Sequence, residues 1–136
     1  MRPEPELTIG RLARSAGVNV ETVRYYQRIG LIDEPAKPAQ GYRRYPGSVV
    51  ERIRFIKRAQ ELGFSLAEIG ELLSLNDGDC DKARTIAEHK NEVIQQRIDS
   101  LSAIRRELAK LIKACRKNTT GQERCAIIAT LTKSRR

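Results

Sequence analysis

Residues 79–125, DCDKARTIAEHKNEVIQQRIDSLSAIRRELAKLIKACRKNTTGQERC, decide the fold of this 136-residue chain and hold all three of its cysteines near their ends. Between Cys80 and Cys115 there is no Gly or Pro, the residues least compatible with a helix interior. Apolar side chains recur every seven residues, which is the spacing of a helix that packs against a partner helix. We therefore predict one long dimerisation helix, with Ile94, Leu101 and Leu108 in its interface.

The length of this helix separates its cysteines. At 1.5 Å per residue, about 35 residues span roughly 50 Å, so Cys80 and Cys115 of one chain cannot share a ligand or a disulfide. An antiparallel homodimer would bring Cys80 of one chain to Cys115 and Cys125 of the other. Three thiolates with no nearby histidine favour a soft, thiophilic ion. We therefore predict that Cys80, Cys115 and Cys125 are metal ligands.

Other interpretations of the cysteines stay open at this point. Cys115 continues the apolar stripe, and free cysteines are often small buried apolar residues. A Cys115–Cys125 disulfide or a thiol-redox switch is a further alternative. The acidic residues at 77, 79, 81 and 88 match part of a calcium loop, but Lys82 stands where that loop needs Gly. The sequence has no Cys–His pair at a recognisable spacing and no phosphate-binding Gly loop. No motif in it therefore indicates an enzyme.

The composition points to an anionic partner. The net charge is +9, and it is concentrated in residues 24–58 and 101–136. Such basic regions are typical of proteins that bind nucleic acid, although a solvated, solubilising surface is the alternative. No apolar run is long enough to span a membrane, and the N-terminus lacks the apolar core of a signal peptide. We expect a cytoplasmic protein.

Residues 8–29 predict a helix-turn-helix. Apolar positions indicate helices over residues 8–16 and 20–29, and Gly17 suits the tight turn between them. The second helix carries Arg24, Tyr25 and Arg28, which are side chains suited to phosphates and base edges. A helical hairpin with solvated arginines is the alternative.

A β wing is predicted after the loop at residues 31–40. The sequence GYRRYP at 41–46 interleaves aromatic and basic residues, which would set Arg43 and Arg44 against the sugar-phosphate backbone. Of Tyr42 and Tyr45, one is expected to pack in the core.

Two further helices complete the N-terminal domain. Each is expected to open with a capping box, formed by Ser48 with Glu51 and by Ser65 with Glu68. We predict three parts: a DNA-binding domain over residues 1–75, a dimerisation helix over 76–117, and a metal-binding loop and tail over 118–136. Residues 126–131 are expected to form one or two helical turns.

Several segments are similar to MerR-type transcriptional regulators. These are LTIGRLA at 7–13, VETVRYY at 20–26, GYRRY at 41–45 and LGFSLAEI at 62–69, and the resemblance covers nearly the whole chain. It implies a mainly α fold, with a winged helix-turn-helix domain, a long antiparallel coiled-coil dimerisation helix and a short metal-binding C-terminal segment. Residues matching the recognition helix and the wing are Arg24, Tyr25, Tyr26, Arg43, Arg44 and Tyr45.

The resemblance also implies a mechanism. A homodimer binds double-stranded promoter DNA and, with metal, bends and untwists it so that RNA polymerase engages the promoter. The implied effector is Hg(II), held by three cysteine thiolates from both subunits. Sensors of Pb(II), Cd(II) and Zn(II) have similarly placed cysteines and are the alternatives. The Cys115–Cys125 loop is one residue longer than in the mercury-, lead- and cadmium-sensing members.

Overall fold

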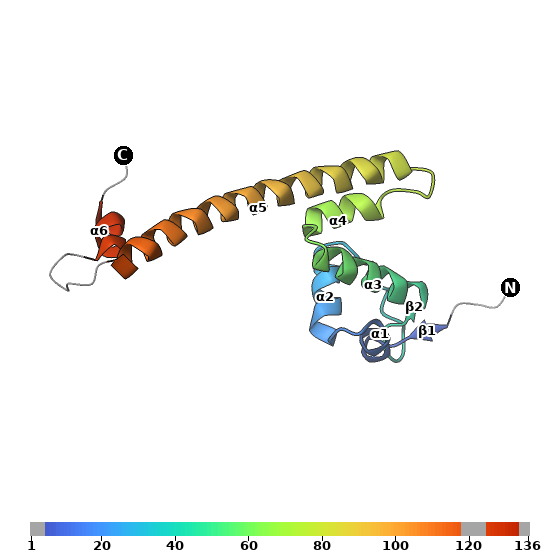
Figure 1. Ribbon diagram of the computed structural model, residues 1–136. Coiled ribbons are helices and arrows are strands. Elements are labelled where there is room, and N and C mark those ends of the chain that lie inside the picture. The colour runs from blue at the N-terminus through green and yellow to red at the C-terminus, as the bar shows by residue number, and fades with distance from the viewer. Residues whose placement is uncertain (1–4, 118–124, 134–136) are drawn as a thin grey trace. The chain divides into compact units, whose positions relative to one another are not determined.

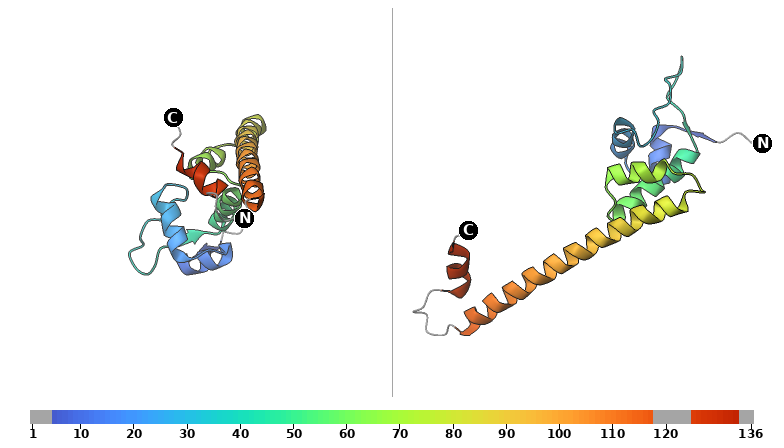
Figure 2. Two further views of the ribbon diagram at one scale, coloured as in Figure 1. Left: turned by 60° about the vertical axis from the view of Figure 1, so that its left-hand side comes forward. Right: turned by 90° about the horizontal axis from the view of Figure 1, so that it is seen from above.

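The computed structural model describes residues 5–117 and 125–133, which form six helices and two short strands. Figures 1 and 2 show these helices and strands along the chain. The chain divides into two compact units between Ala87 and Glu88. The domain boundaries at residues 75 and 117 stay predictions, and the first two turns of the long helix belong with the N-terminal unit. Of the predicted metal-binding loop and tail over residues 118–136, residues 118–124 and 134–136 lie outside the described residues.

The N-terminal unit contains the predicted helix-turn-helix. Helix α1 (Ile9–Ala16) ends at Gly17, whose φ of 73° lies in the left-handed region that glycine adopts without strain. Helix α2 (Val20–Arg28) begins after Asn19, whose side chain accepts a hydrogen bond from the Thr22 N–H at 2.8 Å. Local capping therefore fixes where the turn begins and ends.

The predicted wing contains one short strand with an unexpected partner. Strand β2 (Tyr45–Pro46) pairs antiparallel with β1 (Glu6–Leu7), Leu7 lying opposite Tyr45. A two-residue strand is too short for an alternating pattern to be recognised in the sequence, so β1 was not predicted.

Helices α3 (Ser48–Glu61) and α4 (Leu66–Leu73) close the N-terminal core. The expected Ser65–Glu68 capping box is present, with N–H to oxygen distances of 2.8 and 3.2 Å. The expected cap at Ser48 is wrong, because Ser48 is already helical and Gly47 occupies the N-cap position. Helix α1 packs chiefly against α3 and α2. The core side chains include Leu12, Val23, Tyr26, Tyr45, Ile53, Ile56 and Ile69.

The predicted long helix is present as α5 (Cys80–Lys117), which has 38 residues. None of its residues is buried, and the apolar stripe is 39–61% exposed at Ile94, Ile98, Leu101, Ile104, Leu108 and Ile112. Helix α6 (Ala126–Thr132) confirms the predicted C-terminal turns. None of the helices in the described residues has the length and apolarity needed to cross a membrane.

Candidate functional site

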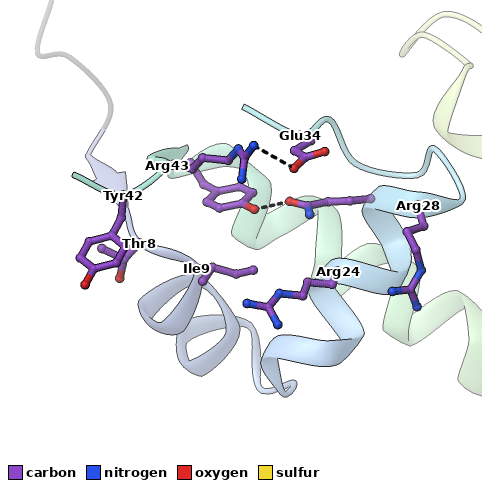
Figure 3. A pocket seen from close by; sticks show the side chains of 9 residues that line it. Thr8, Ile9, Arg24, Arg28, Glu34, Tyr42 and Arg43 are labelled. Atoms are coloured by element: carbon purple, nitrogen blue, oxygen red, sulfur yellow. Dashed lines mark hydrogen bonds and ion pairs between the residues drawn. The ribbon is translucent and has the colours of Figure 1, made fainter. Parts of the chain in front are cut away.

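A basic face forms on the N-terminal unit. Arg24 and Arg28 are four residues apart on α2, so they lie on one side of that helix. Arg43 approaches from the segment before β2, and the three arginines line a pocket of about 410 Å³ (Figure 3). Its other lining residues are Thr8, Ile9, Gln27, Glu34, Tyr42 and Tyr45.

Weak interactions orient these arginines. Arg24 pairs with Glu21 at 3.1 Å, and the Arg28 guanidinium lies 5.8 Å from the centre of the Tyr25 ring. Arg43 donates from Nε to the Pro35 carbonyl at 3.0 Å and pairs with Glu34 at 3.5 Å. Exposed ion pairs of this kind contribute about 0.2–1 kcal/mol, so a phosphate can replace the carboxylates.

Tyr26 and Tyr45 belong to the core rather than to this face. They are only 4% and 2% exposed. The Tyr26 hydroxyl donates to Gln60 at 2.8 Å, and the Tyr45 hydroxyl donates to Gln27. Burial is the main cause that raises the pKa of both phenols. The expectation that these two side chains contact DNA is therefore corrected.

Tyr42 is the aromatic residue that the wing segment exposes, at 80% of its surface. The sequence left open which of Tyr42 and Tyr45 would pack, because both flank Arg43 and Arg44. Arg43 and Arg44 line different pockets. Arg44 is exposed beside a second pocket, of about 570 Å³, which Asp33 and Arg52 also line.

Two of the three cysteines come together. The Sγ atoms of Cys115, near the end of α5, and Cys125, which precedes α6, are 3.8 Å apart, and both thiols are free. A disulfide would need a distance of about 2.05 Å. Two thiolates each about 2.3 Å from a tetrahedral zinc ion would lie about 3.8 Å apart. The pair therefore fits two donors to one thiophilic ion.

The two thiols differ in acidity. The N–H groups of Ile128 and Ile127 lower the pKa of the Cys125 thiol. The pKa of Cys115 is raised, chiefly by its hydrogen bond with Cys125 and also by the charge on that neighbour. Cys125 is therefore the first of the pair to become a thiolate.

Cys80 is not a member of this pair. It is exposed at the first position of α5, 35 residues before Cys115. Among residues 5–117 and 125–133, no three His, Cys, Asp or Glu side chains gather as a metal site. Within the described residues of one chain, Cys115 and Cys125 therefore supply two sulfurs near the end of α5, and Cys80 supplies one at its start.

The helix-turn-helix and its basic face define a DNA-binding regulator, and comparison with known proteins identifies its family. Residues 7–76 match the protein family described as "MerR HTH family regulatory protein". Residues 50–111 match the family described as "MerR, DNA binding". The chain belongs to the MerR family of DNA-binding transcriptional regulators, which are not enzymes.

The relatives include a mercuric resistance regulator and two regulators whose structures contain a metal ion. The mercuric resistance operon regulatory protein of Serratia marcescens is 48% identical over 126 residues, covering 92% of this chain and 87% of that protein. The crystal structure of the dual function regulator MerR from Bacillus megaterium MB1, in complex with mercury(II) ion, is 42% identical, with a TM-score of 0.73 over 93% of this chain and all of the other. The regulator PbrR691 of Ralstonia metallidurans CH34, in complex with lead(II), is 30% identical, with a TM-score of 0.79 over 93% of this chain and 99% of that one.

Proposed function

We propose that this protein is a mercury-responsive transcriptional regulator that binds promoter DNA in the cytoplasm as an antiparallel homodimer. The observation that carries the proposal is the pairing of Cys115 with Cys125 at 3.8 Å while Cys80 begins the same long helix. A second chain running in the opposite direction supplies Cys80 to the pair. Each dimer then has two sites of three sulfurs.

The exposed stripe on α5 supports the homodimer. Six large apolar side chains at helical spacing face solvent in the single chain, and isolated chains rarely leave such a continuous surface uncovered. A second copy of the same stripe covers it at the spacing that a coiled coil requires.

The donor set supports Hg(II) as the effector. Three sulfurs with no nitrogen or oxygen ligand select soft ions. Identity is higher with the mercury-dependent relatives, at 48% and 42%, than with the lead(II)-bound relative, at 30%. The TM-scores rank the two solved structures in the opposite order, at 0.79 for the lead(II)-bound regulator and 0.73 for the mercury(II)-bound one. A TM-score compares the arrangement of the backbone, so it carries less weight for the choice of metal. Pb(II) therefore stays the competing effector, ahead of Cd(II) and Zn(II).

The proposed action joins the metal site to the DNA face. A metal held by both chains fixes one α5 against the other, and each α5 continues from an N-terminal unit that carries Arg24, Arg28 and Arg43. The metal-bound dimer then distorts the promoter so that RNA polymerase engages it. Without metal, the dimer represses the promoter or stays poised on it.

Mixed dimers test whether the site is shared between chains. One chain carries Cys80→Ser, and the other carries Cys115→Ser with Cys125→Ser. A shared site leaves one complete set of three sulfurs in the mixed dimer and none in either pure dimer. We expect about half the wild-type Hg(II) per dimer, read from thiolate-to-metal absorption, together with Hg(II)-dependent transcription in the mixed dimer alone.

A site built within one chain gives the opposite outcome, because every chain in the mixed dimer is then defective. Competition by Pb(II), Cd(II) and Zn(II) in the same titration ranks the alternative effectors. Preferential retention of Pb(II) over Hg(II) would contradict the assigned metal but not the shared site.

A further inference from the structure

Three basic side chains of α3 donate hydrogen bonds to backbone carbonyl oxygens, two in the helix-turn-helix and one in the loop that follows it. Arg54 reaches the Ser15 carbonyl at 2.9 Å, and Lys57 reaches the Gly17 carbonyl at 3.0 Å. Arg52 reaches the Leu31 carbonyl at 2.7 Å. These cations belong to the basic region 24–58, yet they point at the protein's own backbone.

The two contacts near α1 lie where a helix needs them. The last carbonyls of a helix have no partner inside it and carry partial negative charge, so a cation there is favourable. Gly17 adopts its left-handed conformation at this point, and a Cβ built on it would lie 3.6 Å from the Lys57 ammonium. Arg54 and Lys57 thus fasten the turn between α1 and α2 to α3.

We infer that Arg54 and Lys57 are positioning residues for DNA binding and are not phosphate contacts. The turn that they hold leads directly into Asn19 and α2, which presents Arg24 and Arg28. Apolar packing of α1 on α3 anchors one side of this turn, and the two cations anchor the other. The inference rests on the proposed function for its effect on DNA, but the anchoring itself is separately measurable.

The test compares Arg54→Met and Lys57→Met with Arg58→Met. Arg58 is on the same helix and pairs with Glu61 at 3.0 Å instead of with the turn, so each variant removes one positive charge and only the first two release a carbonyl. We expect promoter affinity to fall about threefold to tenfold further in the first two variants than in the control. The ratio of promoter to random-sequence affinity should fall with it.

The salt dependence separates positioning from phosphate contact. Losing a phosphate contact reduces the slope of log K against log salt concentration by about 0.9. We expect Arg54→Met and Lys57→Met to keep the slope of Arg58→Met. A slope shallower by that amount would make these residues phosphate contacts and overturn the inference, while leaving the proposed function intact.

Hydrogen exchange on the DNA-free protein tests whether Arg54 and Lys57 hold the turn between α1 and α2, and this test does not depend on the proposed function. The Gly17 and Val18 N–H groups bond to carbonyls of α1, so their exchange reports on the turn. We expect exchange several times faster in Arg54→Met and Lys57→Met than in Arg58→Met, and recovery in Arg54→Lys and Lys57→Arg, which keep the donor. Equal exchange in the three Met variants would overturn the inference even if promoter binding were lost.

Discussion

At the scale of single residues, Cys115 and Cys125 show how backbone N–H groups can give two identical thiols different pKa values. Cys125 precedes α6, and the N–H groups of Ile128 and Ile127 stabilise its thiolate. The pKa of the Cys115 thiol is raised instead, chiefly by its hydrogen bond with Cys125 and also by the charge on that neighbour. Metal uptake at this end of the chain is therefore expected to begin at Cys125.

Alkylation of the metal-free protein tests this difference. The thiolate is the reacting form, so the rate for Cys125 should reach half its maximum at a lower pH than the rate for Cys115. Iodoacetamide should label Cys125 first near neutral pH, as read by mass spectrometry of the two peptides. In the urea-unfolded chain the two midpoints should converge. Equal midpoints in the folded protein would contradict the assignment.

The tyrosines show what single-residue patterns leave undecided. Arg24, Tyr25, Arg28 and Arg43 stay predicted DNA contacts, and the structure leaves all four of these side chains exposed. Tyr26 and Tyr45 were misassigned because their partners, Gln60 and Gln27, lie 34 and 18 residues away. No local spacing reveals such pairs, and the roles of Arg54 and Lys57 were hidden for the same reason.

At the scale of elements, α5 was predictable and β1 was not. A long helix repeats its pattern over many turns, and an uninterrupted run with apolar residues at heptad spacing has few alternatives. Strand β1 has two residues and exists only because β2 lies beside it. The cap of α3 shows the same limit, since Ser48 and Glu51 had the right spacing and the helix still began one residue earlier than expected.

The stripe on α5 yields a prediction for the dimer. If Cys80 meets Cys115 of an antiparallel partner, the pairing is centred midway between them, near residue 98. Leu101 of both chains then lies close to that centre, so Leu101→Ala removes two buried side chains per dimer. At about 1.5–3 kcal/mol for each, dissociation should increase at least about a hundredfold.

Sedimentation equilibrium measures this change, and Gln96→Ala is the matched control because Gln96 is exposed and off the stripe. The Leu101→Ala chain should keep its helical content and sediment as a monomer at concentrations where the control is a dimer. A Leu101→Ala protein as dimeric as the control would contradict the proposed interface.

At the scale of the whole molecule, the net charge of +9 makes binding to DNA strongly dependent on salt. We propose that part of that charge contacts phosphate, while other basic side chains donate hydrogen bonds to the protein's own backbone carbonyls. Arg43 donates from Nε to the Pro35 carbonyl, but its Nη2 atom pairs with the exposed Glu34 at the basic pocket, so we propose that it contacts phosphate.

Arg43→Ala should therefore weaken binding to promoter and random DNA by similar factors and reduce the slope of log K against log salt concentration by about 0.9. Fluorescence anisotropy from 50 to 200 mM salt measures both quantities, with Arg58→Ala as the control for lost charge. An unchanged slope with weaker promoter binding would give Arg43 a structural role instead.

The separation of 35 positions between Cys80 and Cys115 has a consequence for the cell. On the proposed arrangement, no newly made chain is a sensor by itself, and the number of complete sites rises with the square of protein concentration until dimers dominate. Sensitivity to mercury then depends on how much regulator is present as well as on how much metal enters. A promoter controlling its own regulator would set the detection threshold through the abundance of this one chain.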